Sequence, residues 1–337
     1  MTVKERDNRV DCVKGILELL IVLEHNALIT TSNLQIRPVI NAFCVGCFLL
    51  LTFTRTISDK PLLAHINKYY KYIVTYFLFM TLATLLNSVT FSQLSSSELI
   101  YHYLMSIFYQ SSEHIKLASG FAFFWFIPCL CSLYFLRFIQ LRIGVPFLVI
   151  MALLTLIIGA ANPNLLTAMP FGLHVAFYIY FIGFIYGMIH KRLCTDGIIG
   201  FFACFGFLFL LTMNFMVPPS QLLFAGIIPS IFDGYVFVYY LMILLLAIPG
   251  IYYLTKFLPM TINSSLSLCG RLSLWIYLTH QFYYVFFVKV LNYSSNGFIV
   301  YLMTILFSVI TGVVINYFTI ISNFFLPKRV LPSRLFR

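Results

Sequence analysis

Two histidines stand deep inside apolar stretches of the chain, His25 in LELLIVLEHNALI and His280 in LSLWIYLTHQFYY. An ionisable side chain inside a bilayer costs on the order of 2.5 to 3.5 kcal/mol, so each needs a reason to be there. A buried imidazole can take a proton from a hydroxyl or carry a group as a nucleophile. Taken alone, His280 fits a hydrogen bond between two helices equally well.

The stretch before His25 carries three further ionisable residues, Lys14, Glu18 and Glu24. On a helix at about 100° per residue, Lys14, Glu18 and His25 fall within about 40° of one another, on a stripe directed into the bundle. Glu24 lies about 80° to the side of Lys14 on the same helix. Glu24 or Glu18 could orient the imidazole, as the third member of a catalytic triad does. Lys14 and Glu18 also fit an ordinary i, i+4 ion pair near the membrane surface.

Four cations stand where apolar stretches begin: Lys14, Lys68, Lys71 and Arg271. Such positions suit the phosphates of an anionic ligand, but basic residues also flank membrane spans on the cytoplasmic side without any ligand. Lys68 and Lys71 share one helix face, which favours a site modestly. The eight cysteines show neither a disulfide framework nor zinc-ligand spacing, so no metal site is expected.

The composition is that of a polytopic membrane protein. Of the 337 residues, 61% are hydrophobic and only 9% are charged, where soluble domains carry roughly a quarter charged residues. No polar stretch approaches the roughly 50 residues that a separate soluble domain needs. The first apolar run lacks a small-residue cleavage site and is expected to be retained. We therefore expect an all-α fold and one integral membrane domain over residues 1–337.

A helix needs about 20 apolar residues to cross the hydrocarbon of a bilayer. On that measure the sequence predicts ten spans, at residues 14–32, 38–56, 72–91, 121–139, 144–161, 171–189, 197–216, 235–254, 272–291 and 298–325.

The basic residues set the predicted orientation, because Lys and Arg are retained on the cytoplasmic side during insertion. With both termini in the cytoplasm, 18 of the 21 Lys and Arg residues fall inside, and the exceptions are Arg37, Lys116 and Lys289. The net charge of +11 then follows from topology and from anionic lipid, and it does not indicate a nucleic-acid partner.

Two of the predicted outer segments are unusual. Residues 92–120 carry Leu99, Tyr103, Leu104, Ile107 and Phe108 at helical spacing, which predicts an amphipathic helix on the outer surface. Residues 217–234 are apolar but contain three prolines, which favours a re-entrant or interfacial segment over a span.

Three stretches resemble the acyltransferase 3 family of bacterial membrane proteins, which O-acylate surface polysaccharides and other extracytoplasmic acceptors. They are VKGILELLIVLEH in the first span, FWFIPCL at 124–130 and GRLSLWIYLTH at 270–280. The family's basic residue followed by histidine matches Lys14 and His25, and its Arg-x-x-Arg matches Lys68 and Lys71. The Phe-His-x-Pro motif of a branch resembling fucose acetylases is replaced by Phe43-Cys44-Val45-Gly46, so the chain departs from that branch. The resemblance covers essentially all ten predicted spans.

The resemblance implies a multi-pass O-acetyltransferase of the bacterial inner membrane. It would move an acetyl group from cytoplasmic acetyl-CoA, a substrate rather than a permanently bound cofactor, to a sugar hydroxyl of O-antigen, capsule or exopolysaccharide. The acceptor would be the polysaccharide or a lipid-linked sugar. His25 would be the general base or a transient acyl carrier, with Glu24 and His280 as further catalytic candidates. The cations Lys14, Lys68, Lys71 and Arg271 would face the phosphates of the donor.

Acceptor recognition is expected on the outer side, in residues 92–120 and 217–234, where His114 and Asp233 are candidate sugar-binding groups. A transporter or flippase of lipid-linked sugars is the main alternative, since it would also have ten or more spans and buried ionisable residues. The two halves of the chain show no internal repeat, which disfavours the flippase. A polysaccharide polymerase would be expected to have a large outer loop richer in Arg than either outer segment.

Overall fold

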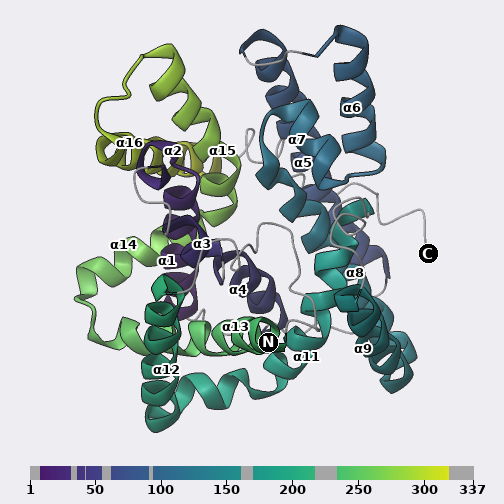
Figure 1. The fold of residues 1–337 in the computed structure, drawn as a ribbon, viewed down its shortest axis with the longest axis vertical. Helices are drawn as coiled ribbons and strands as arrows, with labels where there is room; N and C mark the ends of the chain where they lie inside the picture. Colours follow the sequence, from purple (N-terminus) through teal and green to yellow (C-terminus); the bar gives the residue numbers. More distant parts are fainter. Residues whose placement is uncertain are drawn as a thin grey trace. The chain divides into compact units, whose positions relative to one another are not determined.

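The computed structural model describes residues 8–31, 36–41, 43–54, 62–90, 94–160, 170–216 and 234–318. Within these ranges every regular element is a helix, so the all-α expectation is confirmed (Figure 1). The chain forms two compact units, one made of Met1–Arg55 with Ile182–Val313 and the other of Thr56–Phe181 with Val314–Arg337. A single domain over the whole chain stays a prediction.

The first unit contains helices from both ends of the sequence. They are α1 (Asn8–Glu24), α2 (Ala27–Thr30), α3 (Ile36–Asn41), α4 (Cys44–Leu51), α12 (Gly197–Met216), α13 (Gly234–Leu254), α14 (Met260–Arg271), α15 (Ser273–Val285) and most of α16 (Gly297–Tyr317), with short turns η1 (Thr52–Thr54), η5 (Thr255–Phe257) and the π-helical η6 (Phe286–Val290).

The second unit contains the middle of the chain. Its helices are α5 (Leu62–Thr90), α6 (Ser96–Phe108), α7 (Ser112–Ser119), α8 (Phe126–Ile143) and α9 (Val145–Ala160), with the 3₁₀ turns η2 (Ala122–Trp125) and η3 (Pro170–Gly172). Helix α11 (Leu173–Thr195) begins in this unit and ends in the first.

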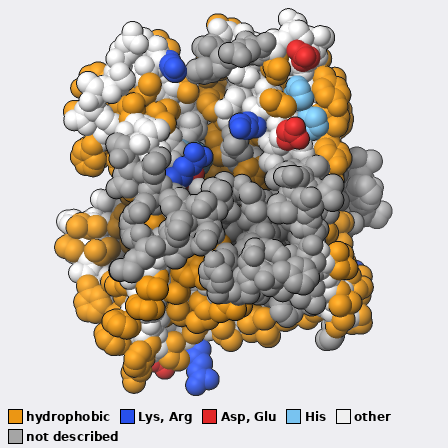
Figure 2. Space-filling model, in the orientation of Figure 1, with side chains coloured by type: hydrophobic (Ala, Val, Ile, Leu, Met, Phe, Trp, Pro, Cys, Tyr) orange, Lys and Arg blue, Asp and Glu red, His pale blue; other side chains and the backbone are white. Residues whose placement is uncertain are grey.

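Four helices in the described ranges are long and apolar enough to cross a membrane: Tyr69–Val89, Phe123–Ile143, Val238–Phe257 and Gly297–Tyr317. A fifth is added if Pro170–Phe177 and Ile182–His190 together form one span. Large apolar side chains such as Val89, Phe202 and Phe205 are exposed on these and neighbouring helices, and many hydrophobic side chains are visible in the described parts of the face drawn in Figure 2. This surface suits contact with lipid. The count of ten spans and the cytoplasmic placement of the termini stay predictions.

The first predicted span, 14–32, is not one continuous helix. Helix α1 ends at Glu24, and Asn26 has an extended backbone (φ −82°, ψ 93°) before α2 begins. The Asn26 side-chain amide donates to Gly297 O at 2.9 Å, and the Asn26 carbonyl accepts from Thr30 N at 3.0 Å. The bond from Thr30 N is the first turn of α2, and the side-chain bond to Gly297 O connects the break to the start of α16. His25 therefore stands at a break in the helix rather than within it.

The predicted outer segment 92–120 forms two helices, α6 and α7. Ser95 and Glu98 make a capping box at the start of α6, and Ser111 caps α7. Asn87 of α5 donates to the carbonyls of Leu117 and Ala118 at the end of α7. Helical structure is present here as predicted, but the apolar run does not form one buried face, and its placement on the outer surface stays a prediction.

Within that run Leu99 is buried, whereas Leu104 and Phe108 are exposed. Residues 217–233, including Asp233, lie outside the described ranges, so that path stays a prediction.

A histidine pair joins α6 to α7. His102 Nδ1 and His114 Nδ1 lie 2.9 Å apart, so one nitrogen donates a hydrogen bond and the other accepts it. Burial lowers the pKa of His114, and the neighbouring His102 lowers it further, against a smaller upward effect of Glu113. The folded protein thus disfavours the protonated form of His114.

Acidification from pH 7 to pH 5 is therefore expected to lower the apparent Tm of the purified protein. Unfolded His114 takes up a proton near its ordinary pKa of 6.5, and the folded form only at lower pH, so stability is lost as the pH falls through this window. Thermal unfolding in detergent across this range should show a flatter pH dependence for His114→Gln. His190→Gln in α11 is the control and should follow the wild-type slope. If the Tm of His114→Gln depended on pH as steeply as that of the wild type, His114 would not be the cause of the acid destabilisation.

Helices α1 and α14 pack backbone against backbone. A Cβ at Gly15 would lie 2.0 Å from Leu266 O, and a Cβ at Gly270 would lie 1.7 Å from Asp11 O. Neither distance leaves room for a side chain, so only glycine allows this approach at either position. Because α15 begins three residues after Gly270, this contact sets where the chain carrying His280 starts relative to α1.

Candidate active site

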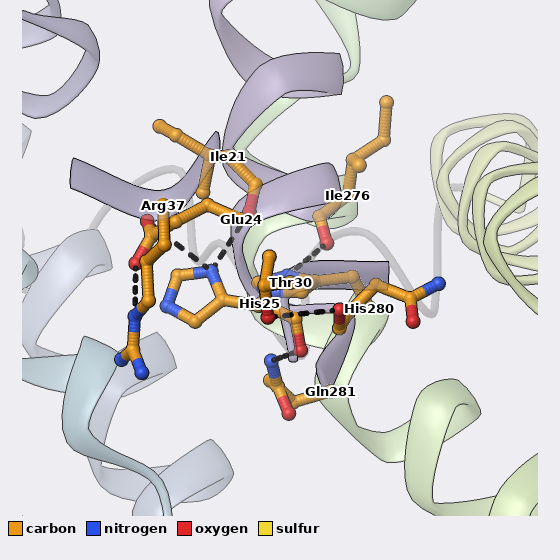
Figure 3. Close-up of polar contacts among 9 residues, drawn as sticks. Ile21, Glu24, His25, Thr30, Arg37, Ile276, His280 and Gln281 are labelled. Carbon is orange, nitrogen blue, oxygen red and sulfur yellow. Dashed lines mark hydrogen bonds and ion pairs between the residues drawn. The ribbon is translucent and has the colours of Figure 1, made fainter. Parts of the chain in front are cut away.

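The break after α1 brings His25 against His280 of α15 (Figure 3). The centroids of the two imidazole rings are 5.1 Å apart, with an angle of 47° between the ring planes. His280 is buried, with 1% of its surface exposed, whereas the His25 side chain is about one-fifth exposed. Gln281 Nε2 donates to the His25 carbonyl at 3.4 Å, which ties the break to α15.

The two imidazoles are held in the same way. His25 Nδ1 lies 2.9 Å from Ile21 O, and His280 Nδ1 lies 3.1 Å from Ile276 O, each a carbonyl four residues earlier (Figure 3). A carbonyl oxygen only accepts, so Nδ1 carries the hydrogen in both rings. The basic lone pair of each neutral imidazole is therefore on Nε2. Two rings with that tautomer suit proton transfer and nucleophilic chemistry.

Glu24 lies beside His25 but contacts Arg37 more closely. Glu24 Oε2 is 4.0 Å from His25 Nδ1, and Glu24 Oε1 accepts from Arg37 Nε at 3.4 Å (Figure 3). Glu24 is 5% exposed, and a buried carboxylate is costly unless it is paired. Arg37 supplies that partner. Any influence of Glu24 on His25 is electrostatic, because the Nδ1 hydrogen is directed to Ile21 O.

A narrow pocket opens between the two histidines and α16. It is lined by Val22, His25, Asn26, His280, Gln281, Tyr284, Tyr301 and Thr304, and its free space is too small for a water molecule, so a bound group would have to move these side chains apart. The lining combines aromatic and aliphatic walls with a few polar groups, as small-molecule sites commonly do.

The structure pairs Lys14 with a different acid from the one that the sequence indicated. Lys14 Nζ lies 3.7 Å from Asp11 Oδ1, three residues earlier, and Asp11 is 2% exposed. Glu18 is buried, and its Oε1 has no hydrogen-bond partner among the residues that the structure describes. The structure therefore shows an ion pair of Lys14 with Asp11 and not the predicted i, i+4 pair with Glu18. Glu18 lies two helical turns before His25, so it does not orient that imidazole directly.

The other predicted donor-site cations are spread over the two units. Arg271 is exposed at the end of α14 and, like Lys14, adjoins the Gly15–Gly270 contact, so these two share one region of the first unit. Lys68 and Lys71 belong to α5 in the second unit, and Lys71 Nζ lies 5.2 Å from the centre of the Tyr72 ring. A donor site that joins all four residues stays a prediction.

Sequence analysis did not single out the polar groups that surround the histidines. Asn26 and Gln281 directly follow His25 and His280, so their position in the sequence could have marked them as part of the site. The sequence marks Thr304 less clearly. Tyr301, Thr304, Ser308 and Thr311 recur at spacings of three and four residues within the apolar helix α16, which marks one polar face.

Comparison with known proteins gives one match. A family model of the acyltransferase 3 family, described as an acyltransferase domain, matches residues 7–318 of the 337-residue chain. No curated protein and no solved structure matches the chain. The matched range includes α1, the break at His25, α15 and α16.

Proposed function

The chain belongs to the acyltransferase 3 family, and on that premise we propose that it is a membrane O-acetyltransferase of the bacterial inner membrane. It would take an acetyl group from cytoplasmic acetyl-CoA and transfer it to a sugar hydroxyl of a cell-surface polysaccharide such as O-antigen, capsule or exopolysaccharide. The observation that carries this proposal is the pair of imidazoles from the break after α1 and from α15, both with Nε2 as the basic nitrogen.

In the proposed step His25 is the general base. The acceptor hydroxyl oxygen attacks the thioester carbonyl carbon while His25 Nε2 takes the hydroxyl proton. The carbonyl π electrons move to oxygen and form a tetrahedral anion. When this anion collapses, the carbon–sulfur bond breaks, and the departing thiolate receives the proton from the imidazolium. The ester, coenzyme A and neutral His25 then balance the reaction.

His280 and Glu24 fit supporting roles in this step. The ring of His280 restricts the position of His25 and places a second imidazole beside the reacting groups. Glu24 places a carboxylate 4.0 Å from His25 Nδ1 and pairs with Arg37 at 3.4 Å, so it would help to hold the break after α1 in position. A second route uses His25 Nε2 as a nucleophile that expels the thiolate and briefly carries the acetyl group.

The donor would approach from the side of the α1–α14 contact. Lys14 and Arg271 adjoin that contact, about 16 Å along α1 from His25 in the case of Lys14. Cations at this distance suit the phosphates of coenzyme A, whose thioester lies at the end of a long extended arm. Lys68 and Lys71 keep the role predicted for them, as further cations for the donor phosphates. The proposal follows the predicted topology, in which the four cations face the cytoplasm.

Radiolabelled acetyl-CoA tests the proposal directly. Membrane vesicles that contain the protein, and the surface polysaccharide of the host, should release free coenzyme A and incorporate label into the polysaccharide. Vesicles from a strain that lacks the gene are the control. Absence of both products with the wild-type protein would contradict the proposal, and movement of a lipid-linked sugar across the membrane in their place would favour a flippase.

A further inference from the structure

Three residues with a hydroxyl group line the pocket beside the histidines: Tyr284, Tyr301 and Thr304. The Tyr301 hydroxyl donates to Leu19 O at 3.1 Å and so holds part of the fold in place. Of the three, only the Thr304 hydroxyl is buried without a hydrogen-bond partner among the described residues.

Thr304 is unusual among the threonines of the helices. Thr75, Thr81 and Thr279 each donate to the carbonyl four residues earlier, at distances of 2.7–2.9 Å. Thr304 is 2% exposed, and its Oγ1 has no hydrogen-bond partner among the residues that the structure describes. Thr84 and Ser308 share that condition, but neither lines the pocket. A buried hydroxyl without a partner is destabilising, so a bound group is expected to supply one.

Asn26 gives a second, independent indication that the pocket receives a polar group. Its Nδ2 donates to Gly297 O, which fixes the orientation of the amide. Its Oδ1 is buried and lacks a partner within the described part of the chain. An amide oxygen only accepts hydrogen bonds, so Asn26 Oδ1 suits a hydroxyl or N–H group of a substrate. It cannot stabilise an oxygen that gains negative charge.

We infer that the Thr304 hydroxyl donates a hydrogen bond to the carbonyl oxygen of the acyl group. This inference rests on the proposed acyl transfer. The oxygen becomes negative in the tetrahedral intermediate, and a hydroxyl donor fixed beside it stabilises that charge more than the charge of the ground state. Thr304 lines the same pocket as His25 and His280, so the reacting carbon would lie between a donor and a base.

The test compares Thr304→Val with Thr304→Ser in membrane vesicles, with radiolabelled acetyl-CoA as the probe. Valine keeps the shape of threonine and removes the hydroxyl, whereas serine keeps the hydroxyl. Loss of an oxyanion donor should lower kcat on the order of 100-fold and leave the KM for acetyl-CoA nearly unchanged. Serine should restore activity to within a few-fold of wild type. Ser308→Ala removes another buried hydroxyl one turn further along α16 and should leave kcat unchanged.

Each outcome decides the inference. If the wild type releases coenzyme A and labels the polysaccharide, and Thr304→Val does so at the same rate, the role of Thr304 is wrong while the proposed function stands. An equal loss in Thr304→Val and Thr304→Ser, or in Ser308→Ala, would assign the effect to packing and overturn the role of the hydroxyl. An inactive wild type would overturn the proposed function and this inference with it. An unchanged Tm of Thr304→Val in detergent would separate lost chemistry from lost folding.

Discussion

Replacement of His25 with Ala is expected to reduce acetyl transfer to background while the protein remains inserted and abundant. The imidazole provides the Nε2 that takes the acceptor proton, and loss of a general base typically lowers a rate about 10²- to 10⁴-fold. The side chain is partly exposed at a helix break, so its removal leaves little cavity. Incorporation of label into polysaccharide measures the activity, and immunoblotting of membranes measures the amount of protein.

A second substitution separates basicity from hydrogen bonding. His25→Asn keeps a side chain of similar size that hydrogen-bonds but is no base near neutral pH, so it should be as inactive as His25→Ala. His190→Ala is the matched control, because His190 Nδ1 also lies against a backbone carbonyl of its own helix, at 2.9 Å from Gly187 O. Substantial transfer by His25→Ala would contradict the role of His25 as the general base. His280 would then be the candidate for that role.

The helices could be predicted from the sequence because hydrophobicity sets the length of each segment. Each predicted span overlaps at least one helix in the described ranges, for example 72–91 with α5 and 298–325 with α16. The breaks could not be predicted in this way. Asn26 leaves the helix because its side chain bonds to Gly297 O, which is 271 residues away in sequence, and no local pattern contains that information.

The second predicted span, 38–56, shows the same limitation. It is divided into α3, α4 and the turn η1. The stretch is apolar throughout, and hydropathy alone does not distinguish one long helix from two short ones. Phe43, with φ −138° and ψ −31°, stands at the start of α4.

The candidate site was predictable in part. His25 follows Lys14 by 11 residues and His280 follows Arg271 by nine, a spacing that predicts similar depths in a membrane. The 5.1 Å between their rings, however, depends on how α1 packs in the first unit. Arg37 is one of the three basic residues that fall outside the predicted cytoplasmic side. The structure explains its presence there, because it forms an ion pair with the buried Glu24. The partner of Lys14 was missed, because Asp11 precedes the predicted span 14–32 and is nevertheless buried.

The packing of α1 on α14 leads to the second large expected effect. Gly270→Ala is expected to destabilise the protein and to abolish transfer, although Ala is normally the better helix former. The new Cβ would lie 1.7 Å from Asp11 O, a backbone atom that cannot move without its helix. Overpacking of this kind costs about 1 to 3 kcal/mol or more, and relief requires α1 to move away from α14. That movement would displace His25 relative to His280.

Gly197→Ala is the matched control for this prediction, because a Cβ at Gly197, the first residue of α12, would meet nothing within 4 Å. It should keep wild-type Tm and activity. Gly15→Ala should behave like Gly270→Ala, since its Cβ would lie 2.0 Å from Leu266 O on the opposite side of the same contact. Thermal unfolding in detergent and incorporation of label from acetyl-CoA measure the two effects. A Gly270→Ala protein with wild-type Tm and transfer rate would show that the contact between α1 and α14 neither holds the fold together nor sets the positions of the histidines.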